Sequence, residues 1–279
     1  MCGHCGCDDE AATTVLNLQT GKQAAIERGG GHAHDHPHSH AHGHEHGHDH
    51  ADGARHGHVV ELEARILAKN EAIAEKNRAW FKGREILALN LVSAPGAGKT
   101  TLLERTIREL KDDVSLFVIE GDQATAMDGN RIRAAGAAAV QVNTGSGCHL
   151  EADMVARALQ ELKPTPGSVV MIENVGNLAC PALFDLGEQA KVVILSVAEG
   201  DDKPLKYPHM FRAAQMMILS KTDLAPHVDF DPGRAVANAL RVNPSIATLR
   251  LSARTGEGLD RWYGWLRGEL ARVHERAFA

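Results

Sequence analysis

The hydrophobic and polar positions divide the chain into a polar N-terminal part and a longer part built from short apolar runs. From about residue 85, runs rich in Val, Ile, Leu and Met recur, with polar or Gly-containing segments between them. Nearly continuous apolar runs, rather than strict alternation, are typical of strands buried on both faces. The predicted strands are 86–92, 114–120, 138–143, 168–174, 191–197, 215–220 and 245–251.

Helical patterns separate these predicted strands. Residues 100–111 and 151–163 carry apolar side chains at helical spacing, with charged residues between them. Strands that alternate with helices predict an α/β domain over residues 85–279, with a mostly parallel sheet and helices on both faces.

The polar part contains one helical pattern, over residues 59–84. An amphipathic helix is predicted there because apolar residues recur at helical spacing. The apolar residues are Val59, Leu62, Ile66, Ile73 and Trp80. Residues 11–31 show no sustained period and are interpreted as a linker.

Composition changes the picture for residues 32–58. This segment holds 12 of the 17 histidines and no large aliphatic residue. It cannot bury enough apolar surface to offset the entropy of ordering, so we expect residues 1–58 to be a largely disordered extension. The histidines from His32 to His58 are predicted to act together as a low-affinity nickel store.

Charge and hydropathy exclude several classes of protein. The formal net charge of −6 argues against a nucleic-acid-binding protein, which usually presents a basic face to phosphates. No apolar run is long enough to predict a membrane span, and no N-terminal apolar stretch resembles a signal peptide. The sequence therefore indicates a cytoplasmic protein, in which thiols stay reduced.

A phosphate-binding loop follows the first predicted strand. Residues 93–100 read SAPGAGKT and open a helix, which is the context that a P-loop requires. Lys99 is expected to reach the β- and γ-phosphates, and the Thr100 hydroxyl to bind Mg²⁺. Ser93 stands where this motif usually begins with Gly, which is a small departure. The predicted nucleotide-binding residues of the loop are Gly96, Ala97, Gly98, Lys99, Thr100 and Thr101.

Two later segments predict that the base is guanine. In SKTD, a carboxylate at Asp223 can accept hydrogen bonds from guanine N1 and the exocyclic amine, and the Lys221 stem can lie over the base. Ser252 and Ala253 follow the last predicted strand in a segment similar to the S-A-K motif, whose backbone contacts the guanine oxygen. GTP and GDP are therefore the predicted nucleotides, rather than ATP.

Acidic residues lie where two predicted strands end. Asp122 and Glu173 follow apolar runs, and the carboxyl edge of a parallel sheet faces the ligand crevice. We expect these two carboxylates to hold Mg²⁺ directly or through water. Asp128 is expected either to orient the attacking water or to cap a helix. Lys99 and these three acids form the predicted catalytic set.

The first candidate metal site is the cysteine motif of residues 1–10. Cys2, Cys5 and Cys7 are close enough in sequence for three thiolates to bind one ion, with the Met1 amine or His4 as a fourth ligand. Thiolates favour Zn²⁺ or Ni²⁺ over Mg²⁺.

A second metal site is predicted inside the α/β domain. Cys148 and His149 precede a helix in TGSGCHL, and Cys180 follows the Glu173 loop. Both loops should lie at the nucleotide edge of the sheet, where their sulfur and nitrogen atoms can bind Ni²⁺ or Zn²⁺. Loss of γ-phosphate contacts would move the Glu173 loop and disturb Cys180, which would link hydrolysis to metal release.

Together these motifs resemble the hydrogenase nickel-incorporation accessory GTPases, the HypB family, over essentially the whole chain. The resemblance rests on the N-terminal C-x-x-C-G-C, the His-rich insert, SAPGAGKTT, EGDQATAMD, NTGSGCHL, ENVGNLACP, EGDDKPLKYP and SKTD. It implies a P-loop GTPase of the SIMIBI class, which includes the signal-recognition and MinD-like proteins. It also implies a GTP-dependent homodimer that acts with a second accessory protein on the large subunit of a nickel–iron hydrogenase.

The resemblance further implies roles for individual residues. It implies that Cys2, Cys5 and Cys7 form a tight nickel site. It implies that Cys148, His149 and Cys180 form a weaker, nucleotide-linked site, often near the dimer interface. Lys203 or Lys206 would reach toward the partner's nucleotide. The expected function is that of a GTP-hydrolysing metallochaperone that delivers nickel.

Three alternatives differ from this interpretation in single features. A urease-type accessory GTPase typically carries a C-P-H metal motif, whereas this chain reads Cys180-Pro181-Ala182. A MinD-type ATPase needs a signature Lys early in the phosphate loop, where Ala94 and Pro95 stand. A nickel or zinc storage protein with a residual nucleotide fold would lack GTP turnover.

Overall fold

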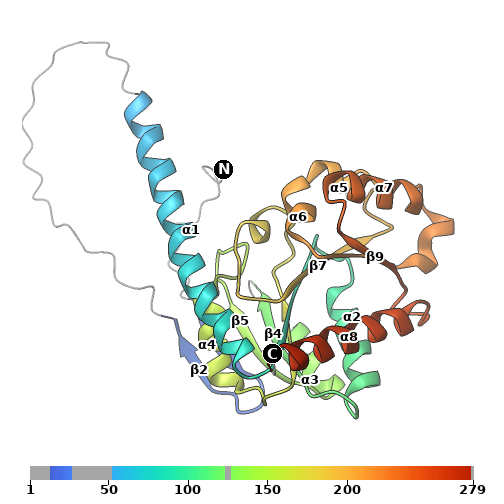
Figure 1. The fold of residues 1–279 in the computed structure, drawn as a ribbon, viewed down its shortest axis with the longest axis horizontal. Helices are drawn as coiled ribbons and strands as arrows, with labels where there is room; N and C mark the ends of the chain where they lie inside the picture. Colours follow the sequence, from blue (N-terminus) through green and yellow to red (C-terminus); the bar gives the residue numbers. More distant parts are fainter. Residues whose placement is uncertain (1–12, 27–51, 123–126, 278–279) are drawn as a thin grey trace, which may run out of the picture.

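The computed structural model describes residues 13–26, 52–122 and 127–277 (Figure 1). The cysteine motif of residues 1–10 and the histidines of residues 32–50 lie outside these ranges, so the hypotheses about them stay predictions. Within the ranges, no helix combines the length and the apolar character that spanning a bilayer requires.

The described residues contain one sheet of nine strands, in the order β2-β1-β5-β4-β6-β3-β7-β8-β9. Neighbours from β5 to β9 run parallel, whereas β1 is antiparallel to both β2 and β5. All strands predicted from apolar runs are confirmed. They are β3 (Leu87–Ser93), β4 (Leu116–Asp122), β5 (Ala138–Asn143), β6 (Val169–Glu173), β7 (Ala190–Ser196), β8 (Met216–Ser220) and β9 (Ala247–Arg250).

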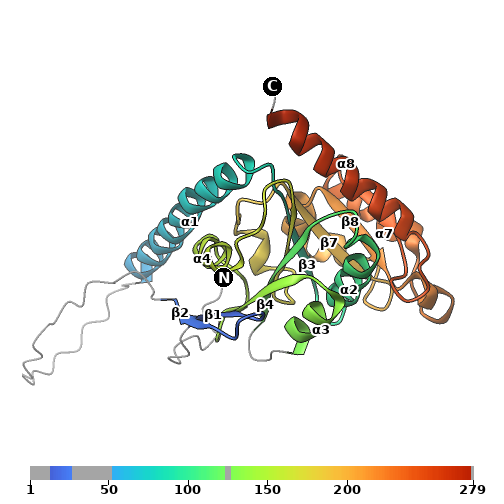
Figure 2. The same ribbon diagram turned by 90° about the horizontal axis from the view of Figure 1, so that it is seen from below.

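Helices cover both faces of the sheet, as predicted (Figure 2). One face carries α2 (Lys99–Leu110), α3 (Met127–Ala135) and α8 (Leu259–Ala277). The other carries α1 (Asp52–Lys82), α4 (Ala152–Leu162), α6 (Pro208–Ala213) and α7 (Pro232–Val242). Shorter turns are the helix α5 (Lys203–Lys206) and the 3₁₀ turns η1 (Cys180–Ala182) and η2 (Thr222–His227).

Strand β3 shows why the apolar runs are unbroken. Leu87, Leu89 and Leu91 enter the cluster packed under α2 and α8. Ala88 and Val92, which alternate with them, enter the clusters on the opposite face. Successive side chains of a strand point to opposite faces, so a sheet covered on both sides needs apolar residues at nearly every position.

The linker predicted for residues 11–31 is wrong, because part of it forms a β-hairpin. Its strands are β1 (Thr14–Asn17) and β2 (Gln23–Ala25). β1 pairs with β5 and thereby extends the sheet, and the hairpin buries Val15 and Ile26. The Ile26 N–H donates to the Thr13 carbonyl oxygen at 2.7 Å, which closes the hairpin at its open end. Strands this short do not establish a detectable sequence period.

The helix predicted for residues 59–84 is present as α1, but it begins at Asp52, inside the segment expected to be disordered. Its buried face also differs from the predicted apolar face, since Ile66 is 44 % exposed. Among residues 64–82, the part of α1 for which burial is described, the buried residues are Asn70, Ala74, Asn77 and Phe81. Two of these are polar, so a search for apolar spacing selects the neighbouring face of the helix.

The two buried asparagines fasten α1 to the sheet domain. Asn77 Nδ2 donates to the carbonyl oxygens of Ala152 and Leu186 at 2.8 and 3.0 Å. Asn70 accepts from the Ala152 N–H at 2.8 Å and donates to the Asp185 carbonyl oxygen at 2.7 Å. α1 therefore joins the N-terminus of α4 to the loop before β7, and Figures 1 and 2 both show it alongside α4.

Gly187 allows the close approach of α1 to this loop, and its substitution should destabilise the fold. Gly187 has a φ of +90°, and a Cβ there would lie 2.5 Å from the Ala74 carbonyl oxygen. We expect Gly187→Ala to lower the free energy of unfolding by at least about 2 kcal/mol, because backbone strain and steric overlap add. Urea denaturation followed by circular dichroism measures this change.

Gly264→Ala is the matched control for this prediction. Gly264 lies within α8, and an added Cβ would meet no atom within 4 Å. The substitution should raise stability by about 0.5–1 kcal/mol, since Ala has the higher helix propensity. Similar stability changes in the two variants would contradict the proposed packing of Gly187.

Candidate functional site

The loop between β3 and α2 is shaped to hold an anion. Ser93 ends β3 and Lys99 begins α2. Between them, Gly96 and Gly98 have φ values of +73° and +100°. Such backbone conformations let successive N–H groups converge, and the N-terminus of α2 adds partial positive charge. The loop therefore suits phosphate groups, as its sequence predicts.

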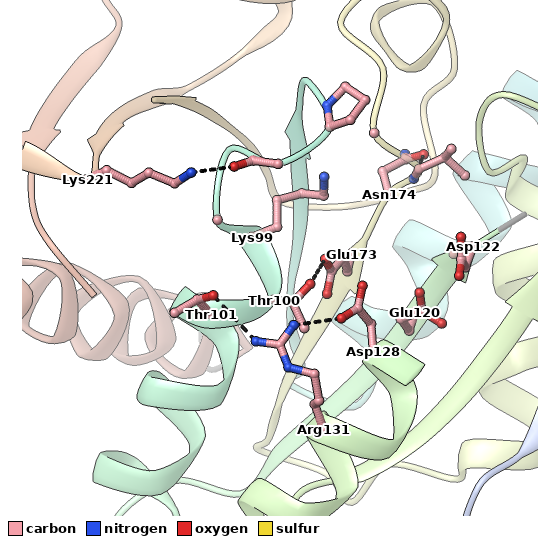
Figure 3. A pocket seen from close by; sticks show the side chains of 16 residues that line it. Lys99, Thr100, Thr101, Glu120, Asp122, Asp128, Arg131, Glu173, Asn174 and Lys221 are labelled. Atoms are coloured by element: carbon pink, nitrogen blue, oxygen red, sulfur yellow. Dashed lines mark hydrogen bonds and ion pairs between the residues drawn. The ribbon is translucent and has the colours of Figure 1, made fainter. Parts of the chain in front are cut away.

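A cavity of about 450 Å³ opens over this loop at the carboxyl edge of the sheet (Figure 3). Predicted residues that line it are Gly96, Gly98, Lys99, Thr100, Thr101, Asp122, Asp128, Glu173 and Lys221. The lining also includes side chains that the sequence analysis did not single out, namely Glu120, Arg131 and Asn174. Cations and carboxylates thus face one another across a space open to a ligand.

Lys99 is buried at the start of α2. Its Nζ donates to the Ser93 hydroxyl oxygen at 2.8 Å, and the residue is 8 % exposed. Burial lowers the pKa of Lys99, while the nearby carboxylates of Glu173 and Asp128 oppose that shift. An ammonium group has three donors, so Lys99 retains the capacity to bind phosphate oxygens.

Two buried carboxylates lie side by side opposite Thr100. Glu120 and Glu173 are register partners on β4 and β6, and Thr100 Oγ1 donates to Glu173 Oε1 at 2.7 Å. The Oε2 atoms of both have no hydrogen-bond partner among the described residues. Burial, with repulsion from Glu173, raises the pKa of Glu120 to about 9, and burial raises the pKa of Glu173 to about 7. These oxygens fit the preference of Mg²⁺ for hard donors.

The other two predicted acids lie at the rim of the cavity. Asp122 ends β4 two residues after Glu120, so both side chains are on the same side of the strand. Asp128 lies in the first turn of α3 and pairs with Arg131 at 2.7 Å, and Arg131 also pairs with Glu104 at 2.7 Å. The proposed role of Asp128 in orienting water stays a prediction.

A second pocket, of about 250 Å³, adjoins the phosphate loop. The predicted base-reading residues line it together, namely Lys221, Asp223, Ser252 and Ala253. Ser252 Oγ donates to Asp223 Oδ1 at 2.6 Å, which orients that carboxylate. Lys221 Nζ donates to the Gly96 carbonyl oxygen at 2.7 Å. The pocket therefore connects the end of β8 to the phosphate loop, as a base next to its phosphates requires.

The structure brings the three predicted metal ligands of the domain together. The sulfur atoms of Cys148 and Cys180 and a ring nitrogen of His149 all lie within 4.8 Å of one another. Cys148 precedes α4, whereas Cys180 begins the turn η1 after β6, so the sheet topology rather than the sequence makes them neighbours. Two sulfurs and one imidazole form a donor set suited to Ni²⁺ or Zn²⁺.

Burial keeps His149 in the form that binds metals. Its ring stacks on Phe184 with centroids 3.9 Å apart, and burial lowers its pKa to about 4, so the imidazole is neutral at pH 7. Nε2 has no hydrogen-bond partner among the described residues, and the Glu151 carboxylate is 3.8 Å away. Phe184 was not predicted, because the residue that holds the ring is distant in sequence.

The two lysines of the EGDDKPLKYP segment lie on α5. Lys206 pairs with Asp202 at 2.7 Å, and Lys203 Nζ is 5.3 Å from the centroid of the Tyr207 ring. Their suggested reach toward a partner's nucleotide stays a prediction.

Known proteins are similar in sequence to most of this chain. The family model for the CobW/HypB/UreG nucleotide-binding domain matches residues 87–250. Hydrogenase maturation factor HypB of Rhizobium leguminosarum bv. viciae is 58 % identical over 220 residues, which cover 79 % of this chain and 74 % of that protein. The Escherichia coli K12 protein of the same name is 55 % identical over 216 residues, with coverages of 77 % and 74 %.

Solved structures give the same result. Hydrogenase maturation factor HypB from Archaeoglobus fulgidus matches with a TM-score of 0.69 and 39 % identity, over 73 % of this chain and 99 % of that one. HypB from Helicobacter pylori, solved in complex with nickel, matches with a TM-score of 0.68 and 35 % identity, over 73 % and 96 %. The chain therefore belongs to the HypB family of hydrogenase maturation factors.

Proposed function

We propose that this protein is a GTP-hydrolysing metallochaperone that binds nickel and delivers it to the large subunit of a nickel–iron hydrogenase. The observation that carries the proposal is the convergence of Cys148, His149 and Cys180 beside a nucleotide cavity at the same edge of the sheet. The names of its relatives, and a similar protein solved with nickel, support it.

GTP is the proposed nucleotide because of the second pocket. A carboxylate accepts hydrogen bonds and cannot donate them, so Asp223 favours guanine, which presents two donors, over adenine. The hydrogen bond from Ser252 holds Asp223 in position for this contact.

Mg²⁺ is the proposed divalent ion of the cavity. Thr100 and Glu173 would hold it, with Glu120 and Asp122 directly or through water. Within the described residues, the buried Oε2 atoms of Glu120 and Glu173 have no hydrogen-bond partner, and carboxylate oxygens are ligands that Mg²⁺ prefers. When bound, Mg²⁺ neutralises charge on the phosphates. Lys99 and the loop amides bind the β- and γ-phosphates and stabilise the charge that develops during hydrolysis, and Asp128 orients the water.

The proposed reaction works as a switch, with slow hydrolysis timing the release of metal. Nickel is the cargo of the Cys148–His149–Cys180 site, and Zn²⁺ can occupy the same donors. We propose that Cys2, Cys5 and Cys7 bind nickel tightly and that the histidines of residues 32–58 store it. A GTP-dependent homodimer and a second accessory protein complete the proposed delivery system.

Lys99→Ala should abolish GTP hydrolysis and leave metal binding by the N-terminal cysteines intact. Phosphate release should fall at least about 10²-fold, because Lys99 supplies charge at the transferred phosphoryl group. Lys111→Ala, which removes an exposed lysine from the end of α2, should keep the parent rate. Equal loss of turnover and of nickel binding in Lys99→Ala would argue against separate sites.

Glu120→Gln should stabilise the metal-free protein at alkaline pH. A carboxyl whose folded pKa is raised to about 9 binds its proton more tightly in the folded than in the unfolded state. Stability therefore falls as the pH rises from about 5 to about 9, by at most about 1.4 kcal/mol per pH unit. Urea denaturation in EDTA should show that Glu120→Gln reduces this slope.

Glu75→Gln, which alters an exposed carboxyl of α1, is the control for this pH dependence and should keep the parent slope. The assignment of a buried protonated carboxyl would be refuted if the stability of the parent rises between pH 6 and pH 9 and Glu120→Gln shows the same pH dependence.

Cys148→Ala should remove the metal site of the domain. In the complete chain with Cys2, Cys5 and Cys7 replaced by Ser, thiolate-to-cobalt absorption reports Co²⁺ bound at the remaining cysteines. Affinity should fall at least about tenfold, since even outer-shell changes have effects of that size. Ser146→Ala, in the same loop, should retain the absorption band. An unchanged titration of Cys148→Ala would eliminate the site.

A further inference from the structure

A chain of buried polar side chains runs beneath the sheet edge from the nucleotide cavity to both metal-binding loops. Its members are Asn174, Asn90, Glu188 and Lys191. Each is nearly inaccessible, with Asn90 at 0 %, Asn174 at 1 % and Lys191 at 5 % exposure, and the Glu188 side chain at 5 %. None of the four is used by the proposed chemistry.

Asn174 connects the cavity to the Cys148–His149 loop. It directly follows Glu173 and lines the cavity, as Figure 3 shows. Its Oδ1 accepts hydrogen bonds from the Leu150 N–H at 3.1 Å and from the Val175 N–H at 3.0 Å. Leu150 is the residue after His149, so the position of the histidine depends on that of Asn174.

Asn90 and Glu188 continue the chain under β3. Asn174 Nδ2 donates to Asn90 Oδ1 at 3.2 Å, and Asn90 Nδ2 donates to Glu188 Oε1 at 3.0 Å. Glu188 Oε2 accepts from the Leu186 N–H at 2.7 Å, and its Oε1 is 3.7 Å from Lys191 Nζ. The links from Asn174 to Asn90 and from Asn90 to Glu188 are hydrogen bonds between buried groups, so movement of one of these residues leaves a buried partner unsatisfied. The link from Glu188 to Lys191 is an ion pair.

Lys191 connects this series of buried polar side chains to the Cys180 loop. Its Nζ donates to the carbonyl oxygens of Pro181 at 2.8 Å and of Phe184 at 3.2 Å. Pro181 follows Cys180 in the turn η1, and Phe184 is the ring on which His149 stacks. One buried ammonium group therefore holds both the backbone beside the thiol and the support of the imidazole.

The fold alone does not require these polar residues. Asn90 lies between Ala88 and Val92 on one face of β3, and Lys191 shares its face of β7 with Val193. Those neighbours are fully buried and apolar. Replacing a buried pair of charges as a whole by apolar residues of similar volume is often neutral or stabilising, whereas removing one partner alone leaves the other unsatisfied.

We propose that Asn90, Glu188 and Lys191 are positioning residues that set the separation of the Cys148–His149 and Cys180 loops according to the nucleotide sensed at Asn174. The inference rests on the proposed function, since it assumes that the three ligands bind metal. A nucleotide that shifts the Glu173–Asn174 segment alters the hydrogen bonds of Asn174. The buried polar side chains then displace the Cys148–His149 loop and the Cys180 loop.

The test compares Co²⁺ affinity in two nucleotide states. The complete chain with Cys2→Ser, Cys5→Ser and Cys7→Ser is titrated with Co²⁺ in GDP and in a non-hydrolysable GTP analogue. Thiolate-to-cobalt absorption in the near ultraviolet requires a cysteine ligand, so the histidines of residues 32–58 give no signal.

Two variants interrupt the chain in different ways. Glu188→Gln combined with Lys191→Met removes the buried pair of charges at nearly constant volume. Asn90→Val disconnects Asn174 from Glu188 with a residue that suits its strand. Gln189→Met is the matched control, because within the described residues the Gln189 side chain hydrogen-bonds to the backbone of Ile86 and Ala88, at the start of β3.

In the parent, the Co²⁺ dissociation constants should differ at least about fivefold between the two nucleotides, as is typical of coupled sites. The ratio of the two Co²⁺ dissociation constants should fall below about twofold in both variants. Both variants should retain the thiolate-to-cobalt absorption band and the affinity of the parent for GDP. Gln189→Met should keep the parent ratio.

The inference is overturned if a folded variant keeps the parent ratio, or if the parent binds Co²⁺ equally in both nucleotide states. Absence of the thiolate band from the parent would instead refute the proposed metal site. The outcomes thus separate failure of the coupling from failure of the proposed function.

Discussion

The parallel register of β3, β4 and β6 places the phosphate loop and the buried carboxylates of the cavity at one edge of the sheet. Glu173 ends β6 and is the register partner of both Glu120 and Leu91, and β3 and β4 each continue two residues further along the same edge. The loops that follow them must emerge together at this edge. A slip of one residue would exchange the side chains that the clusters on the two faces receive, so core packing and site geometry are fixed by the same pairing.

The sheet edge concentrates charges that a core normally excludes. Lys99, Glu120 and Glu173 are 8 %, 2 % and 4 % exposed, and burial disfavours ionisation of all three. These buried groups are stabilised by partners of opposite charge, which the proposed polyphosphate and Mg²⁺ would supply. His149 is also buried, in its neutral form, and its Nδ1 lies 3.6 Å from the Cys148 sulfur, which suits the proposed role as a metal ligand.

The sequence predicts those features that are local or that repeat. Strands buried on both faces are unbroken apolar runs, and the phosphate loop is one contiguous motif. The position of Glu120 beside Glu173 depends on the pairing of β4 with β6, which no local sequence pattern contains. The buried face of α1 was missed because Asn70 and Asn77 contribute hydrogen bonds instead of apolar surface. The first hairpin was missed because its strands are too short to show a period.

The closure of that hairpin has a consequence for the proposed metal site at the N-terminal cysteines. Thr13 and Ile26 are joined by a hydrogen bond of 2.7 Å, so residues 1–12 and the stretch after residue 26 leave the sheet from a common anchor. Twelve residues reach at most about 40 Å when extended. The N-terminal thiols can therefore reach only points of the domain within this distance of Thr13. Such contacts are intramolecular, so their rate does not depend on protein concentration.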